Sequence, residues 1–179
     1  ASRNSVPADQ WDAFDQVVQE RGGVPSTGPG SITINVPEMA RRMNHLSEYL
    51  RQASTLSPRT QEMAMLVTAR ELDCKFIWNA HAAAGRKAGL RDALVDGLRD
   101  KTDLPSLNAE EAALINYGRE FFNTRQVRKE TFDAALGQFG IRGLTELTNL
   151  MGYYAMLAFN INAFGVEIPQ DHTEPELPV

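Results

Sequence analysis

Apolar residues recur at intervals of three and four along most of the chain, which is the spacing of an amphipathic helix. The first stripe predicts a helix over residues 7–21, and the second predicts a helix over residues 37–53 that begins at Pro37. Their apolar faces consist of Trp11, Phe14, Val17 and Val18, and of Met39, Met43, Leu46 and Leu50. The first part of the chain is therefore expected to be helical, apart from the segment between these helices.

Start and stop signals divide the middle of the chain into three more helices. Ser57 followed by Pro58 marks a start, because serine accepts a hydrogen bond from the first turn and proline suits the first helical position. That helix is expected to end near residue 72. Asp73 is the expected N-cap of a helix over residues 74–88, which Gly89 terminates, and a short helix follows over residues 91–99.

The C-terminal half contains the most apolar segment. Asn108 and Glu111 resemble a capping box and predict a helix that ends near residue 124. A further helix over residues 131–139 is expected to stop at Gly140, and residues 143–164 are expected to form a central buried helix. The pattern indicates no credible sheet. The predicted fold class is therefore all-α, a single domain of seven or eight helices.

Glycine and proline mark the segments that flank this domain. Residues 22–35 hold two prolines and four glycines, which indicates an ordered loop, and the alternation at Ile32 and Ile34 favours a short extended segment. This loop is a candidate cover for a substrate or a neighbouring subunit. We expect an N-terminal extension over residues 1–36, a helical domain over residues 37–168 and a C-terminal surface arm over residues 169–179.

Charge and composition narrow the function classes. Of the 179 residues, 18 are Lys or Arg and 23 are Asp or Glu, so a net charge of −5 argues against nucleic-acid and membrane-surface binding. No apolar run is long enough to span a membrane. The single cysteine, Cys74, excludes an intramolecular disulfide and fits a reducing cytoplasm. His45 and His172 have no partners at ligand spacing, so we expect no metal site.

The candidate chemistry lies between Glu62 and His81. Cys74, Ile77 and His81 share one face of their predicted helix, with Trp78 beside them. The rise of roughly 10 Å from Cys74 to His81 excludes a direct hydrogen bond, but both can reach one substrate. Glu62 joins them if its helix packs antiparallel, and a carboxylate beside an imidazole favours proton transfer.

Taken singly, each of these residues also suits a structural role. Free cysteine and tryptophan are common in cores, His81 stands among alanines, and Glu62 would pair with Arg59 three positions earlier. The helix N-terminus favours a Cys74 thiolate, whereas the charge of Asp73 opposes it, so the sequence leaves the direction open.

The combination is more specific than its members. The pattern Glu-x11-Cys-x2-Ile-x3-His, from Glu62 to His81, resembles the active site of the carboxymuconolactone decarboxylase and alkylhydroperoxidase D superfamily. The segments LSPRTQEMAMLVTAR, W-x2-H, AGL and LMGYYAMLAFNINAFGVEIP resemble its decarboxylase-like branch. The likeness covers about residues 35–169 and is most specific over residues 57–90. It implies an alkylhydroperoxidase D-like helical fold that forms homotrimers or homohexamers with active sites near subunit interfaces.

The likeness also suggests roles for the site residues. His81 would be the general acid and base, Glu62 would orient it or carry a second proton, and Cys74 would be a polar or thiolate neighbour. Arg59 would hold a substrate carboxylate. The pocket would be lined by Ile77, Trp78, Tyr153 and Tyr154.

One position departs from both branches of the superfamily. The peroxidase branch has a second cysteine where this chain has Ile77, and the decarboxylase-like branch commonly has glutamate there. Without a second cysteine, the disulfide-cycling peroxidase mechanism is disfavoured. Without the glutamate, one proton donor of the decarboxylase-like branch is missing.

Three functions remain open at this point. The first is a cofactor-free lyase or isomerase that acts on a small carboxylated or aromatic-derived compound. The second is a peroxidase or redox protein that depends on Cys74 alone. The third is a non-catalytic oligomeric protein that binds a small molecule. The spacing of Glu62, Cys74 and His81 favours the first.

Overall fold

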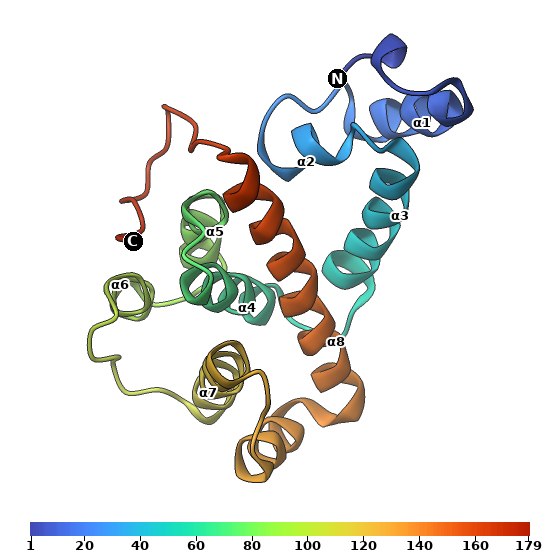
Figure 1. Cartoon of the computed structure of the whole chain (residues 1–179). Coiled ribbons are helices and arrows are strands. Elements are labelled where there is room, and N and C mark those ends of the chain that lie inside the picture. Colours follow the sequence, from blue (N-terminus) through green and yellow to red (C-terminus); the bar gives the residue numbers. More distant parts are fainter.

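Eight α-helices and no strand make up the computed structural model, which describes residues 1–179 (Figure 1). The all-α prediction is therefore confirmed. The helices are α1 (Trp11–Arg21), α2 (Gly28–Thr33), α3 (Pro37–Glu48), α4 (Pro58–Glu71), α5 (Lys75–Lys87), α6 (Asp92–Asp100), α7 (Ala109–Thr124) and α8 (Lys129–Phe164). Two 3-10 turns, η1 (Arg3–Ser5) and η2 (Ala8–Gln10), precede α1, and a π-helical turn, η3 (Tyr49–Ala53), continues α3. None of the helices combines the length and apolar composition needed to cross a bilayer.

Helix α4 lies at the centre of the fold. Every residue from Thr60 to Arg70 is buried, and α4 packs against α5, α7 and α8. Its start follows the predicted signal, because the Ser57 hydroxyl accepts a hydrogen bond from the Thr60 backbone at 3.1 Å. Any polar side chain on the middle of α4 must consequently find its hydrogen-bond partners inside the protein.

The N-terminal helices form a second, smaller apolar cluster, and α3 leads from it through η3 to α4 (Figure 1). The cluster consists of Val6, Phe14, Val17, Ile34 and Ala40. The expected extended segment at Ile32 and Ile34 is wrong, because Gly28 and Pro29 start the short helix α2. On α3, Met43 is buried, whereas Met39 and Leu46 are 42% and 46% exposed.

Two helix boundaries differ from the prediction for local reasons. Asp73 has a φ of 48°, in the left-handed region, so Cys74 rather than Asp73 is the N-cap of α5. The predicted helices over residues 131–139 and 143–164 are two arms of α8. They meet at Gly140, whose φ of 63° and ψ of 174° bend the chain there.

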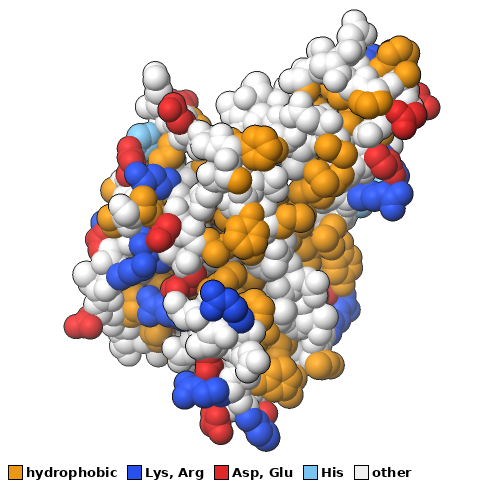
Figure 2. Space-filling view, viewed as in Figure 1, with side chains coloured by type: hydrophobic (Ala, Val, Ile, Leu, Met, Phe, Trp, Pro, Cys, Tyr) orange, Lys and Arg blue, Asp and Glu red, His pale blue; other side chains and the backbone are white.

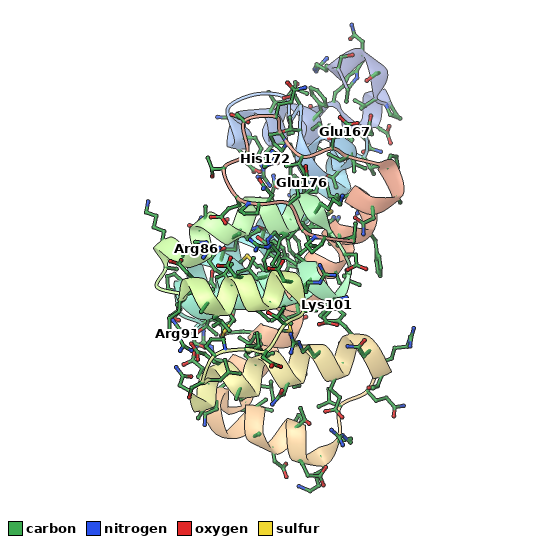
Figure 3. The ribbon with its side chains drawn as sticks, turned by 90° about the vertical axis from the view of Figure 1, so that its left-hand side faces the viewer. Arg86, Arg91, Lys101, Glu167, His172 and Glu176 are labelled. Atoms are coloured by element: carbon green, nitrogen blue, oxygen red, sulfur yellow. The ribbon has the colours of Figure 1, made fainter.

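The C-terminal arm lies against α4 and α5, on the face that Figure 3 turns toward the viewer. Leu177 is only 1% exposed. Arg70 donates a hydrogen bond to the Pro178 carbonyl at 2.8 Å, and Asn79 donates one to the Glu174 carbonyl at 3.1 Å. The predicted surface arm is thus docked through one buried side chain and several polar contacts.

Glu146 on α8 anchors the π-helical turn. Its carboxylate accepts hydrogen bonds from the Tyr49 hydroxyl at 2.8 Å, the Thr55 backbone at 2.8 Å and the Thr55 hydroxyl at 2.5 Å. Burial raises the pKa of the Glu146 carboxyl, but hydrogen bonds from Thr55, Tyr49 and Arg142 outweigh it and lower this pKa to about 2. Tyr49 and Thr55 flank Arg51, so Glu146 fixes the turn that carries this arginine.

The stabilisation from Glu146 should depend on pH. A carboxyl with a lowered folded-state pKa stabilises the protein above its unfolded pKa, here 4.5, and this is lost as the pH falls toward about 2. We expect Glu146→Gln to lower the free energy of unfolding by about 1–3 kcal/mol at neutral pH and by progressively less in acid. Urea unfolding measures this, with the exposed Glu48→Gln as control. An equal loss at neutral and acidic pH would contradict the assignment.

Candidate functional site

Glu62 and His81 form a buried pair between α4 and α5. His81 Nδ1 lies 2.7 Å from Glu62 Oε2, and the two side chains are 12% and 8% exposed. Because an ionised carboxylate only accepts, the ring hydrogen lies on Nδ1, and Nε2 has no hydrogen-bond partner within the protein. The structure thus brings together two residues that stand nineteen positions apart in the sequence.

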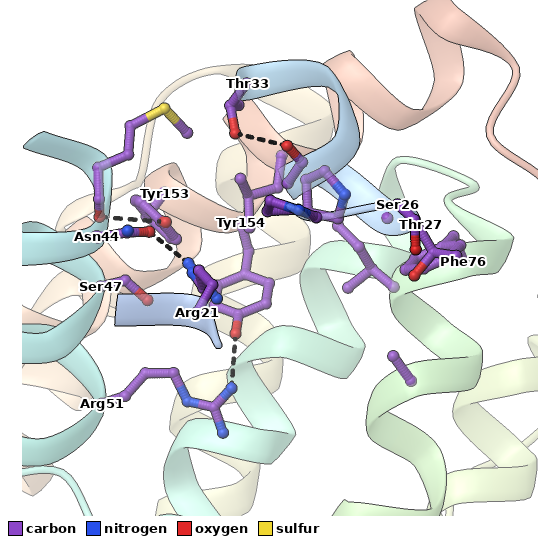
Figure 4. A pocket seen from close by; sticks show the side chains of 18 of the residues that line it. Arg21, Ser26, Thr27, Thr33, Asn44, Ser47, Arg51, Phe76, Tyr153 and Tyr154 are labelled. Carbon is purple, nitrogen blue, oxygen red and sulfur yellow. Dashed lines mark hydrogen bonds between the residues drawn. The ribbon is translucent and has the colours of Figure 1, made fainter. Parts of the chain in front are cut away.

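Arg51 extends this pair to a third element, the π-helical turn. Its Nη2 lies 3.3 Å from Glu62 Oε1, and its Nη1 donates to the Tyr154 hydroxyl on α8 at 3.1 Å (Figure 4). The His81 ring meets the Tyr154 ring edge-on, with centroids 5.1 Å apart. His81, Glu62, Arg51 and Tyr154 therefore form one connected cluster, called the site cluster below.

The site cluster opens on a cavity of about 620 Å³. Three members of the cluster, Arg51, His81 and Tyr154, line it, and Ile77 and Tyr153 contribute to its walls. Arg21 also faces the cavity, where its guanidinium donates to the Asn44 side chain (Figure 4). Two arginines and no acidic side chain line the space, which favours an anionic ligand.

Residues 22–30 cover one side of the cavity. Gly28 in this segment has a φ of 63°, and a Cβ placed on it would lie 2.9 Å from the Phe76 ring. Only glycine combines this backbone conformation with so close an approach to α5. This segment, which was a candidate cover in the sequence, therefore contributes to the cavity wall next to the site cluster.

Cys74 lies apart from the cavity. Its side chain is fully buried and does not line the space that His81 faces. Burial raises the pKa of the Cys74 thiol, although backbone hydrogen bonds from Ile77 and Phe76 oppose this. The sequence left open whether the pKa of Cys74 is raised or lowered. In the structure it is raised, which favours the protonated thiol, the less nucleophilic form.

Arg59 and Trp78 also lie outside the cavity. Arg59 pairs with Glu111, which is 1% exposed, and donates a hydrogen bond to the Gly89 carbonyl at 3.3 Å. Because Glu111 is buried, it needs cationic partners, and Arg59 and Arg91 supply them. Trp78 is 1% exposed and belongs to the core. The arginine that contacts Glu62 is Arg51, whereas Arg59, which the resemblance suggested for a substrate carboxylate, pairs with Glu111.

Sequence reasoning missed Arg51, Arg21 and Glu146. Arg51 stands near the end of a predicted helix, where its charge has an ordinary surface explanation. Its one signal was the largely polar composition of residues 51–60, which gives no direction for the side chain. Nowhere in the structure do three or more His, Cys, Asp or Glu side chains gather as a group that could hold a metal ion.

Comparisons with known proteins agree with this architecture. Residues 37–118 match the profile of the carboxymuconolactone decarboxylase family. No curated protein matches the chain. An uncharacterised peroxidase-related protein from a Silicibacter species is similar in structure, with a TM-score of 0.70 and 18% identity over 93% of this chain and 87% of that one.

Two other solved structures share the fold. The core of an alkylhydroperoxidase AhpD, an uncharacterised peroxidase-related protein from Ralstonia eutropha, has a TM-score of 0.70 and 16% identity over 96% of this chain and 90% of that one. A protein of unknown function from Agrobacterium tumefaciens has a TM-score of 0.68 and 18% identity over 75% and 93%. Residues 37–118 are thus similar to the carboxymuconolactone decarboxylase family, and the chain has the alkylhydroperoxidase D-like fold.

Proposed function

We propose that the protein is a cofactor-free lyase or isomerase that moves a proton on a small carboxylated compound. The observation that carries this proposal is the Glu62–His81 pair, which leaves Nε2 of His81 free beside a cavity lined by arginines. Glu62 holds the ring in one orientation and stabilises the imidazolium that forms when Nε2 takes a proton. Arg51 and Arg21 attract the carboxylate of the substrate.

Two reactions fit this arrangement. In an isomerisation, Nε2 of His81 takes a proton from a carbon next to a carbonyl, and the C–H electron pair moves to give an enolate. The proton then returns to a different carbon. In a decarboxylation of a β-keto acid, the C–C bond breaks, carbon dioxide leaves, and the resulting enolate takes its proton from protonated His81. Neither reaction requires an oxidant or a reductant.

The geometry gives less support to a Cys74-dependent peroxidase. Its thiol is buried, its pKa is raised by that burial, and Ile77 stands where a second cysteine would resolve a sulfenic acid. A non-catalytic binding protein would use the same cavity without proton transfer. The experiment below therefore separates the three functions.

Deuterium exchange in D₂O tests the proposal directly. A panel of β-keto acids and β,γ-unsaturated carboxylic acids is incubated with the protein, and proton NMR follows the loss of C–H signals and the appearance of the signals of a decarboxylated or isomerised product. We expect at least one compound to react, with His81→Ala slower by about 10²–10⁴-fold and Glu62→Ala slower by at least about tenfold. Cys74→Ala should retain the activity of the wild type.

His45→Ala, on the polar side of α3, is the matched histidine control. Rates for His81→Ala within a few-fold of wild type would contradict the proposal. So would saturable binding of an acid without any exchange, which would identify a binding protein. Exchange that is lost in Cys74→Ala and kept in His81→Ala would favour the thiol-dependent alternative.

We also propose that the chain assembles with copies of itself. Large apolar side chains stay exposed on α3, η3 and α8, and Figure 2 shows hydrophobic side chains in a broken band over this side of the molecule. They include Met39, Leu46, Tyr49, Phe159 and Phe164, which are 42% to 70% exposed. Burial of such a surface against another subunit would stabilise an assembly.

Light scattering after gel filtration checks this assembly. We expect the mass of a trimer or a hexamer of the 19.8 kDa chain. Leu46→Glu, which places a charge on the exposed face of α3, should shift the mass toward the monomer. A wild-type mass of 19.8 kDa at micromolar concentration would contradict the proposal.

A further inference from the structure

The Tyr154 hydroxyl is held in an unusual way. Its oxygen accepts a hydrogen bond from Arg51 Nη1 at 3.1 Å, and its own hydrogen has no acceptor in the protein. The side chain is 4% exposed, yet it lines the cavity. The Arg51 cation polarises this buried hydroxyl, and no protein acceptor takes its hydrogen. The hydroxyl can therefore donate a hydrogen bond to a ligand.

The position of this hydroxyl fits the chemistry of His81. The rings of Tyr154 and His81 are 5.1 Å apart between centroids and nearly perpendicular, at 81°, and both line the same cavity. A small molecule that places a carbon against Nε2 of His81 therefore lies next to Tyr154 as well. Ile77 on the cavity wall is apolar, so another group must stabilise the negative charge that develops on a substrate.

We infer that Tyr154 and Arg51 form an oxyanion site in which the Tyr154 hydroxyl donates to the enolate oxygen that develops when His81 removes a proton. This inference rests on the proposed function, which it deepens by naming an enolate as the species that the site stabilises. The C–H electron pair moves into the carbon framework, the carbonyl oxygen becomes negative, and the proton resides on His81 Nε2. Arg51 polarises the phenol from behind and leaves its O–H free for that oxygen.

The state of Tyr154 suits this role. Burial raises the pKa of the Tyr154 phenol to about 12, although Arg51 opposes this, so the hydroxyl keeps its proton at neutral pH. Tyr153, the neighbouring cavity residue, is different, because its hydroxyl donates to the Met43 carbonyl at 3.3 Å. Of the two tyrosines that line the cavity, only Tyr154 has a hydrogen to offer.

Binding of 4-nitrophenol tests the oxyanion site without the natural substrate. Its phenolate resembles an enolate, and its absorbance distinguishes the phenolate from the phenol. We expect the wild type to bind the phenolate, and Tyr154→Phe to weaken this binding by about tenfold or more. Tyr117→Phe is the matched control: Tyr117 is also buried and hydrogen-bonds Thr148 at 2.8 Å, but it does not line the cavity.

A second probe separates this role from a structural one. The methyl ether 4-nitroanisole has nearly the same shape but no oxyanion, so Tyr154→Phe should change its binding by less than about twofold. Equal weakening of both probes, no phenolate binding by the wild type, or equal effects of Tyr154→Phe and Tyr117→Phe would overturn the inference. Circular dichroism confirms that each variant is folded.

The two proposals fail in different ways. If a carboxylic acid exchanges deuterium through His81 but phenolate binding does not depend on Tyr154, the oxyanion site is wrong and the proposed function stands. If phenolate binding depends on Tyr154 but no acid exchanges deuterium, the oxyanion site stands and the proposed proton transfer is wrong.

Discussion

A carboxylate within the buried stretch of α4, Thr60 to Arg70, must find hydrogen-bond donors inside the protein, and Glu62 meets this requirement with His81 and Arg51. An unpaired charge at this depth would destabilise the fold strongly. The pairing therefore brings α5 and the π-helical turn to α4, and through Arg51 it also reaches Tyr154 on α8. The same contacts that satisfy the buried carboxylate orient the imidazole toward the cavity.

Two elements outside the four-residue site cluster support it: Glu146 positions Arg51, and residues 22–30 form part of the cavity wall. Glu146 on α8 holds both flanks of the π-helical turn, so the helix that carries Tyr154 also positions the arginine that contacts it. π-Helical turns are uncommon and are frequently found at functional sites. Residues 22–30, ahead of the family-matched region, add a wall and contribute to a cavity without acidic side chains. The shape of the cavity, and its lack of acidic side chains, thus come partly from a segment outside residues 37–118.

The parts of the fold that depend on local signals were predictable from the sequence. Ser57 and Asn108 cap their helices as expected, because a cap involves residues only three positions apart. The boundary at Asp73 was wrong by one residue, since its left-handed backbone depends on the turn between α4 and α5. Met39 and Leu46 lie on the predicted apolar face of α3 but stay exposed, because a periodic pattern does not show what covers a face.

The candidate site was predictable only in part, because sequence spacing does not show which distant residues pack against a side chain. The spacing of Glu62 and His81 placed both residues in one region, and the structure brings them into contact. The choice between Arg51 and Arg59 could not come from spacing, because Glu111, a residue distant in sequence, pairs with Arg59. The accessibility of Cys74 depends in the same way on packing around α5, which leaves this thiol buried.

The position of the hydrogen on the His81 ring shows directly whether Glu62 orients the imidazole. Long-range proton–nitrogen NMR of the ring, at a pH where the imidazole is neutral, identifies which nitrogen carries the hydrogen. We expect the Nδ1–H form in the wild type, since Glu62 accepts from Nδ1, and a shift toward the Nε2–H form in Glu62→Ala. An Nε2–H form in the wild type, or no change in Glu62→Ala, would contradict the pairing from which the proposed chemistry follows.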